Sequence, residues 1–274
     1  MTTYQGASGG LTRDDASSVV KRELERRIGD VWPVGTKLPG ERTLAAEFGV
    51  SRAVVREVLQ SLAAQGLIHI SPARGAFVKR PDGSALSTAL SQIVSAHNAT
   101  VRDVFEARVL LETEVAVRAA RNRGGTVVPR LRSLAATVDD SPDRLGQAIA
   151  DMEFHALLCA AARNPVLTAM HRAITPYALL MMLRRERDHP VGGATHAQIT
   201  EAVAAGDVEE TRRLVIAHLD STQIFFGSDF DRPVDEVAAE NLARISGGFW
   251  TLEDVVRRAF AALDALADEI DKEQ

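Results

Sequence analysis

The sequence has few of the residues that build disulfide-bonded or membrane proteins. Its 274 residues include one cysteine, Cys159, so no internal disulfide can form, which fits a reducing compartment. No window holds the run of about eighteen apolar residues that a membrane-spanning helix needs, and residues 1–17 lack the apolar centre of a signal peptide. We therefore expect a cytoplasmic protein in which Cys159 is a small core residue rather than a nucleophile.

Several signatures of catalysis are also missing. The sequence contains no HExxH motif, no P-loop and no arrangement typical of Ser-His-Asp catalysis. Apolar residues make up 46% of the chain and charged residues 25%, a composition typical of globular proteins with real cores.

Charge is distributed unevenly along the chain. Residues 1–80 contain 12 Lys and Arg against 8 Asp and Glu, a net charge of +4. Residues 81–230 carry −3 and residues 231–274 carry −6, so the total of −5 hides a basic N-terminal segment. A basic N-terminal segment followed by an acidic remainder indicates that the N-terminal part contacts nucleic acid.

The basic segment has the pattern of three helices followed by a β-hairpin. The predicted helices are "ASSVVKRELERRIGD" (16–30), with Val19, Val20, Leu24 and Ile28 inward, then "ERTLAAEFGV" (41–50) and "RAVVREVLQSLAAQ" (52–65). Ser51 is a suitable N-cap for the third helix, and Gly66 ends it. Two short strands, within 67–70 and 75–80, flank a turn tipped by Arg74 and Gly75. The sequence therefore predicts a helix pair with a wing.

The third of these helices is amphipathic. Its apolar face consists of Val54, Val55, Val58, Leu59 and Leu62, and its polar face begins with Arg52 and Arg56. Arginines near the start of a helix that packs on a neighbour are placed to contact phosphates or guanine edges in a major groove. On its own, such a pair is more often solvated charge.

The surrounding motif favours the DNA-contact interpretation. Residues 35–78, "GTKLPGERTLAAEFGVSRAVVREVLQSLAAQGLIHISPARGAFV", closely resemble the winged helix-turn-helix of the GntR family of bacterial regulators. The resemblance implies contact with double-stranded DNA by six residues: Arg42, Ser51, Arg52, Arg56, Arg74 and Gly75.

Beyond the Pro-, Gly- and Ser-containing linker at 79–87, strand patterns vanish and an all-α antiparallel bundle is expected. Its candidate helices are residues 100–123, 126–138, 142–163, 165–187, 193–205 and 208–228. The predicted fold class is thus mainly α, with four parts: a winged helix-turn-helix at 12–80, a linker and first linking helix at 81–99, a helical domain at 100–229, and an acidic helical extension at 230–274.

Four ionisable residues lie on core-facing stripes of three predicted helices. Asp151 and His155 are four residues apart in "DMEFH", His196 precedes Ile199 and Val203 at helical spacing, and His218 aligns with Leu214. Taken singly, each is more often a hydrogen-bonded core residue than a ligand. Together they are costly to bury, and a divalent cation would offset that cost. Periodicity does not show that the three helices converge.

A second resemblance implies that they do converge. The segments "FEARVLLETEVAVRAAR", "ADMEFHALLCAAARNPVL" and "THAQITEAVAAGDVEETRRLVIAHL" look like the FCD ligand-binding domain of the FadR branch of GntR regulators, over about residues 100–225. It implies that Asp151, His155, His196 and His218 hold a divalent metal ion; zinc is preferred, with nickel or manganese as alternatives. Thr195 stands where relatives often carry an acidic residue before the histidine.

The same resemblance implies an effector pocket above the metal. A small carboxylate suits a site of about +1 charge, and Arg108 is the best candidate for a second contact to it, with a salt bridge to Glu112 at i+4 as the alternative. Weaker candidates for the pocket wall are Asn164, His171 and Tyr177.

Two functions are compatible with these residues. The first is a homodimeric repressor that leaves a palindromic operator when a sugar acid or hydroxy acid binds at the metal. The alternative is a metal-dependent hydrolase built on the helical domain, which lacks a general base paired with the ligands because Glu153 points away. We expect the regulator and not an enzyme.

The C-terminal segment extends beyond either resemblance. From Thr251, a suitable cap, Leu252, Val256, Ala259, Leu263, Leu266 and Ile270 follow a short heptad pattern. This predicts a helix that pairs with another protomer or lies on its own domain.

Overall fold

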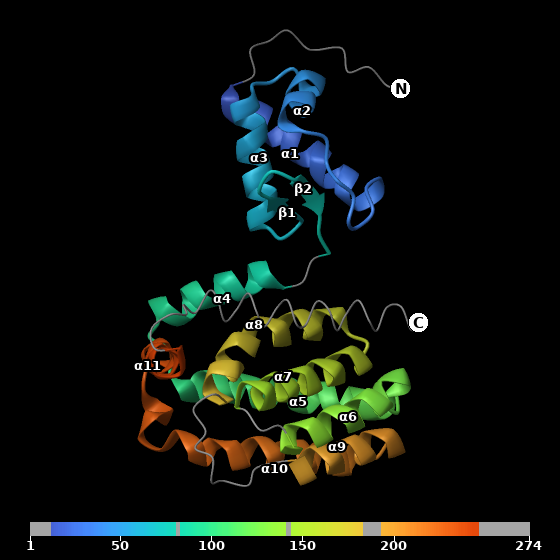
Figure 1. Cartoon of the computed structure of the whole chain (residues 1–274), viewed down its shortest axis with the longest axis vertical. Coiled ribbons are helices and arrows are strands. Elements are labelled where there is room, and N and C mark those ends of the chain that lie inside the picture. The colour runs from blue at the N-terminus through green and yellow to red at the C-terminus, as the bar shows by residue number, and fades with distance from the viewer. Residues whose placement is uncertain (1–11, 81–82, 141–143, 183–192, 247–274) are drawn as a thin grey trace. The chain divides into compact units, whose positions relative to one another are not determined.

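The structure is a computed structural model that describes residues 12–80, 83–140, 144–182 and 193–246 (Figure 1). The chain divides between Ala85 and Leu86 into two compact units, each with its own hydrophobic core. The part of the chain that the structure describes is mainly helical with one small hairpin, which confirms the predicted fold class. None of the helices in these ranges is long and apolar enough to cross a membrane.

The N-terminal unit contains the three helices and the hairpin that the sequence predicts. Its elements are α1 (Arg13–Asp30), α2 (Glu41–Phe48), α3 (Arg52–Ala64), β1 (Ile68–Ser71) and β2 (Gly75–Val78). The Ser51 hydroxyl accepts a hydrogen bond from the backbone N–H of Val54 (3.3 Å) and caps α3 as expected. Gly49 ends α2 in the left-handed region (φ +66°), a conformation that glycine adopts without strain.

The hairpin pairs β1 with β2 in antiparallel register from Ile68 opposite Val78 to Ser71 opposite Gly75. The segment that joins α1 to α2 lies along the other edge of β2. There the backbone N–H groups of Gly35 and Leu38 donate to the carbonyls of Val78 and Ala76, both at 2.9 Å. The wing is therefore braced on both edges of β2.

The core of this unit forms as the amphipathic pattern of α3 predicts. All five apolar residues predicted on its inner face are buried, and Arg52 and Arg56 are exposed. One prediction for α1 is wrong: Val19 is 36% exposed. Adjacent helical residues point about 100° apart, so when Val20 is buried Val19 lies at the edge of the packed face.

The second unit is a bundle of helices. Its elements are α4 (Ser84–Ala96), α5 (Val101–Arg121), η1 (Gly125–Val127), α6 (Val128–Asp140), α7 (Arg144–Ala161), α8 (Pro165–Met182), α9 (Gly193–Ala205), α10 (Val208–Gln223), η2 (Ile224–Asp231) and α11 (Val234–Ser246). Thr100 starts α5 with a reciprocal capping box to Asp103. Helix α5 packs against α7, α8, α9 and α10 and is the centre of the unit.

Near the end of the bundle, one helix boundary differs from the sequence prediction and one helix, α11, was not predicted. The helix expected over 208–228 ends at Gln223, and a 3₁₀ segment follows that is kinked at Gly227, whose backbone (φ +48°, ψ −125°) is not helical. Helix α11 lies in the predicted extension but begins well before Thr251. The heptad helix predicted from Thr251 lies outside the described residues.

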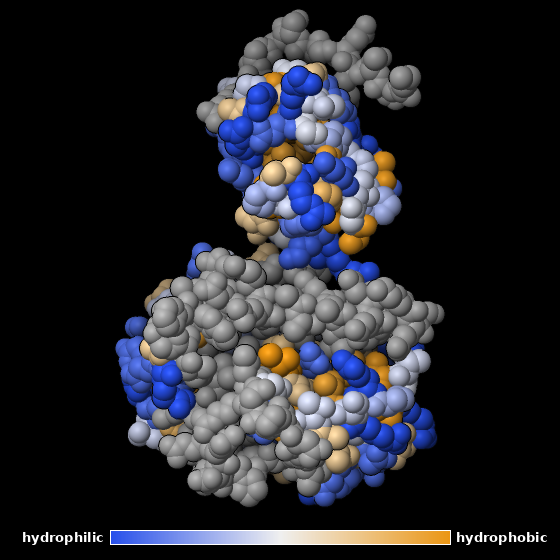
Figure 2. Space-filling view, in the orientation of Figure 1, coloured by the Kyte–Doolittle hydropathy of each residue, from blue (hydrophilic) through white to orange (hydrophobic). Residues whose placement is uncertain are grey.

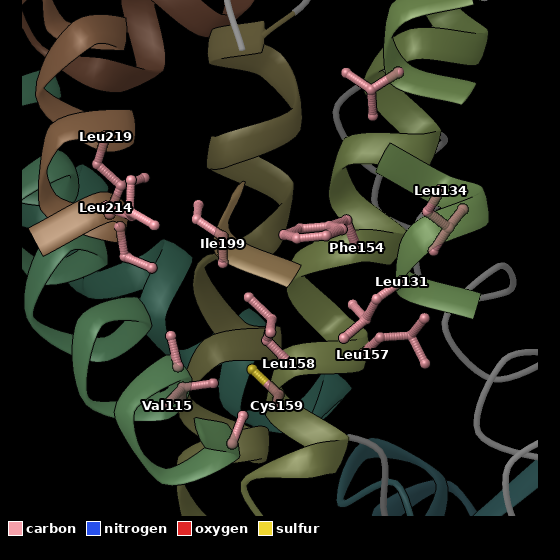
Figure 3. Close-up of a cluster of buried hydrophobic side chains, with 14 of the residues drawn as sticks. Val115, Leu131, Leu134, Phe154, Leu157, Leu158, Cys159, Ile199, Leu214 and Leu219 are labelled. Atoms are coloured by element: carbon pink, nitrogen blue, oxygen red, sulfur yellow. The ribbon is translucent and has the colours of Figure 1, made fainter. Parts of the chain in front are cut away.

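The hydrophobic core of the second unit surrounds the middle of α7. Figure 3 shows Phe154, Leu157 and Leu158 of α7 near Ile199 of α9 and Leu214 of α10, and all of these are buried. Cys159 is also buried in this cluster, as expected for a small core residue. The packing fixes the mutual positions of α7, α9 and α10, which carry the polar residues considered next.

Candidate metal centre and nucleic-acid interface

Helices α7, α9 and α10 bring four buried polar side chains together. Asp151 and His155 lie one turn apart on α7, His196 lies on α9 and His218 on α10. Each has one potential ligand atom within 4.8 Å of the others, and none of the four residues is more than 3% exposed. The fold therefore brings the three helices together, which the sequence periodicity could not decide.

The spacing of these side chains suits one cation. His196 Nε2 lies 2.9 Å from Asp151 Oδ1, and His155 Nε2 lies 3.6 Å from Asp151 Oδ2. The ring centroids of His196 and His218 are 4.4 Å apart. Ligand atoms on opposite sides of a zinc ion are separated by at most roughly 4.2 Å, twice the usual bond length, so small rotations would bring all four into range.

Several atoms of the cluster lack well-oriented hydrogen bonds despite their burial. Among the described residues they include Asp151 Oδ2, His155 Nε2 and both ring nitrogens of His196. Unpaired buried polar atoms cost about 1–3 kcal/mol each, so a set of them in one place needs a partner. Nitrogen and carboxylate oxygen are the donors that zinc and similar cations take, and the residues fit such an ion.

The electrostatic environment favours the metal-binding forms of His218 and Asp151. Burial lowers the pKa of His218 well below its ordinary value, and the neighbouring His196 and His155 lower it further. Burial alone would raise the pKa of Asp151, but His155 and His196 lower it below its usual range. A neutral imidazole and an ionised carboxylate are the states that bind metal.

A buried carboxylate that sequence reasoning did not single out stands behind His155. Glu112 Oε2, on α5, lies 2.8 Å from His155 Nδ1. Burial by itself raises the pKa of Glu112, but Arg108 and His155 lower it well below its ordinary value. The sequence assigned Glu112 only as a partner for Arg108, although a carboxylate behind a ligating histidine is a recurring device in metal sites.

Arg108 lies beside the cluster and forms the salt bridge offered as the alternative to effector contact. Its Nε donates to Glu112 Oε1 at 2.6 Å, and its Nη2 lies 4.0 Å from Asp151 Oδ2. Both side chains of the Arg108–Glu112 pair are buried. Contact between Arg108 and an effector stays a prediction.

The other candidates for the pocket wall have structural contacts of their own. His171 is buried with Nε2 3.3 Å from Glu112 Oε1; burial lowers its pKa, but Cys159 and Glu112 outweigh this and raise it. Asn164 Oδ1 caps α8 by accepting from the N–H groups of Val166 and Leu167, both at 3.1 Å. Tyr177 is fully buried. The side chain of Thr195 lies outside the described residues.

Glu153 faces away from the cluster, as predicted. Its Oε2 lies 3.9 Å from Arg130 Nη2 on α6.

In the N-terminal unit, the polar face of α3 carries an arginine pair held by one carboxylate. Arg56 donates to Glu41 through Nε (2.9 Å) and Nη2 (2.8 Å), and Arg52 Nη2 lies 3.4 Å from Glu41 Oε2. Hydrogen bonds from Arg56 lower the pKa of Glu41 below its ordinary value, so the carboxylate is ionised. Both arginine side chains are more than half exposed.

The remaining predicted DNA contacts are also at the surface. Arg42 and Ser51 are exposed at the starts of α2 and α3, and Arg74 and Gly75 are exposed at the tip of the hairpin. The Arg74 guanidinium lies 5.7 Å from the centre of the Phe77 ring on β2. Figure 2 shows large hydrophilic areas on the visible face of this unit, broken by smaller hydrophobic ones. Contact of these residues with DNA stays a prediction.

Comparison with known proteins identifies both parts of the chain. Residues 16–78 match the profile of bacterial regulatory proteins of the gntR family, and residues 103–221 match that of the FCD domain. HTH-type transcriptional regulator LutR of Bacillus subtilis is 28% identical over 75% of this chain and 98% of its own. HTH-type transcriptional repressor NanR of Cronobacter sakazakii is 28% identical over 77% of this chain and 85% of its own.

A solved structure shows the same fold. The Streptococcus agalactiae GntR structure superposes with a TM-score of 0.54 at 21% identity, covering 76% of this chain and 99% of that one.

The winged helix-turn-helix, the FCD domain and the relatives together define a transcriptional regulator rather than an enzyme. The chain belongs to the GntR family, in the FadR-like subfamily that carries an FCD domain.

Proposed function

We propose that this regulator is a cytoplasmic repressor whose release from DNA depends on a metal-bound small carboxylate. The observation that carries the proposal is the buried set of Asp151, His155, His196 and His218, placed in a chain whose N-terminal unit is a winged helix-turn-helix. The relative NanR is named a transcriptional repressor, which supports the proposal that this protein also represses transcription. In this proposal residues 12–80 bind DNA and residues 100–229 bind the metal and the effector.

The four residues would hold one divalent ion, and zinc agrees best with three imidazoles and one carboxylate. When bound, such an ion supplies a fixed positive charge with Lewis-acid character. Asp151 cancels one charge and the Arg108–Glu112 pair is neutral as a whole, so the site would keep a net charge of about +1. A small carboxylate suits that charge, and sugar acids or hydroxy acids add hydroxyl groups for the polar side chains around it.

Arg108 is the residue we assign to the effector carboxylate. Its Nε is used by Glu112, which orients the guanidinium and leaves further N–H groups available. His171, Asn164 and Tyr177 are proposed as the wall of the pocket. The side chains therefore bind and orient the effector, and no covalent step is required.

The switch works through the spacing of two DNA-binding units. Two protomers of a homodimer place their α3 helices in major grooves of a palindromic operator, with Arg42, Ser51, Arg52, Arg56, Arg74 and Gly75 at the DNA. An effector that binds better to one arrangement of the helical domains than to the other shifts the population toward it. If the spacing of the two α3 helices in that arrangement does not match the spacing of the operator half-sites, ligand binding releases the protein from DNA and relieves repression.

The test combines elemental analysis with a thermal-shift screen of sugar acids and hydroxy acids, each with and without a chelator. We expect about one equivalent of zinc, and stabilisation by zinc of about 2.7 kcal/mol when its concentration is 100 times its Kd. A stabilising acid should lose its effect after chelation and should weaken operator binding in a gel-shift titration. Metal-free protein with an unchanged response to the acid would overturn the metal's role, and tighter operator binding would reverse the sign of the switch.

Substituting Glu112 tests the support behind the metal ligands. We expect Glu112→Gln to weaken zinc binding about 10- to 100-fold, the range typical of carboxylates behind ligating histidines, because His155 loses its charged neighbour. Zinc affinity is measured by competition with a chromogenic chelator.

Glu114→Gln on the same helix is the control, since Glu114 pairs with Arg118 away from the cluster. Equal zinc affinity of folded Glu112→Gln and the control would show that Glu112 does not orient His155.

A further inference from the structure

Glu41 bridges the two arginines of α3 from the neighbouring helix. It is the first residue of α2, and Arg52 and Arg56 lie one turn apart at the start of α3. The carboxylate therefore joins the two helices of the helix-turn-helix at the face where DNA contact is proposed. Its ion pairs are exposed, so their contribution to folding is small.

The contact with Arg56 uses one particular edge of the guanidinium. Arg56 donates to Glu41 from Nε and Nη2, which are the side edge of the planar group. The second N–H of Nη2 and both N–H groups of Nη1 remain on the outer end. Two N–H groups on that end have the geometry that matches the O6 and N7 acceptors of guanine in the major groove.

Arg52 is held differently. It has a single longer contact to Glu41, 3.4 Å from Nη2, and its side chain is 64% exposed. Arg52 can therefore turn toward a phosphate more freely than Arg56 can. The two arginines share one negative charge, which leaves the group with a net charge of about +1 instead of +2 and weakens its attraction for phosphates of any sequence.

We propose that Glu41 is a specificity-determining positioning residue: it presents the outer end of Arg56 to a guanine and at the same time limits sequence-independent binding. This inference rests on the proposed DNA-binding function of α3 and deepens it. A carboxylate that only joined α2 to α3 would alter stability without altering which sequences are bound, and this difference makes the inference testable.

The experiment selects bound sequences from a random duplex DNA pool with the full-length protein and its Glu41→Gln variant. Glu47→Gln is the matched control, because Glu47 lies on the same helix and pairs with Arg27 of α1 (2.7 Å) away from α3. Affinities are then measured for the selected duplex, for versions with each G·C pair replaced, and for a mixed-sequence duplex. Circular dichroism and thermal melting verify that all variants are folded.

We expect wild type and Glu47→Gln to require the same G·C pair in each half-site. Glu41→Gln should lose about 5- to 100-fold of the discrimination at that pair, the range of one bidentate guanine contact, and should bind the mixed-sequence duplex several-fold more tightly. Arg56→Lys, which keeps the charge but not the planar fork, should lose the discrimination without the tighter mixed-sequence binding.

The outcomes separate the inference from the function on which it rests. If folded Glu41→Gln selects the wild-type sequence and discriminates the G·C pair as Glu47→Gln does, Glu41 is only a link between two helices and the inference fails while DNA binding stands. If wild-type protein enriches no sequence and binds no duplex, the proposed function itself fails.

Discussion

Replacing His218 with alanine is expected to abolish tight zinc binding, with a loss of affinity of at least about 100-fold. Removal of a residue behind a metal ligand already costs about 10- to 100-fold, and removal of a ligand itself must cost more. His218 is 1% exposed and its pKa is lowered by burial, so in the native protein it presents a neutral imidazole. Zinc affinity is measured by chelator competition and the effector response by thermal shift.

A histidine of the same unit outside the cluster gives the control for this substitution. His97 is exposed just after α4, and His97→Ala should bind zinc and respond to the acid as wild type does. His218→Ala should keep its helical circular dichroism but lose both zinc and the acid-induced shift. Full zinc affinity in folded His218→Ala would remove His218 from the proposed ligand set.

The second large effect is expected at the polar face of α3. Arg52→Ala combined with Arg56→Ala should weaken binding to the selected DNA sequence by about 100-fold or more, since one good bidentate base contact is worth about 1–3 kcal/mol and a phosphate contact adds to it. The slope of log affinity against log salt should fall by about 1 for each phosphate that the variant no longer neutralises. Both side chains are more than half exposed, so the fold should be unaffected.

Arg26→Ala controls for the loss of positive charge from the same unit. Arg26 is exposed on α1 and pairs with Glu23 there. Its variant should keep the sequence preference of wild type and nearly all of its affinity. A double arginine variant that still bound the selected sequence with wild-type affinity would show that α3 does not read DNA through these two residues.

The part of the metal centre that lies on one helix could be predicted from the sequence. Asp151 and His155 are four residues apart, so any helix through them places both on one stripe, and both are buried. That His196 and His218 meet them depends on how α7, α9 and α10 each pack on α5. Periodicity fixes the face of a helix but not its neighbours, so this step came from family resemblance alone.

Two carboxylates that contact proposed functional residues from another helix, Glu112 and Glu41, were harder to recognise from the sequence. Glu112 had a sufficient partner at i−4 in Arg108, and this local pair concealed its approach to His155 from another helix. Glu41 is separated from Arg56 by a helix end and a turn, so no spacing rule joins them. Sequence spacing can predict contacts within one helix, but it could not predict these two contacts between different helices.

Local backbone chemistry explains the errors in helix boundaries. Helix α10 ends at Gln223, and the non-helical backbone of Gly227 prevents any helix from continuing to residue 228; the apolar residues around Gly227 do not reveal this. Helix α11 could have been predicted, since Val234, Val237, Ala238 and Leu242 have helical spacing and all are buried. The heptad pattern after Thr251 is the more regular of the two, and it drew the prediction to a segment outside the described residues.

The placement of the four polar residues on α7, α9 and α10 also bears on local opening of the helical unit. Helix α7 is far from α9 and α10 in the chain, so in the proposed zinc-bound protein the ion is a cross-link that closes the long segment between His155 and His196. Fraying of α9, a helix of 13 residues, would then require release of the metal at His196 and not merely the loss of side-chain packing. Occupancy of the centre would thus set how often the short helix detaches, and metal supply would act on the lifetime of the folded bundle.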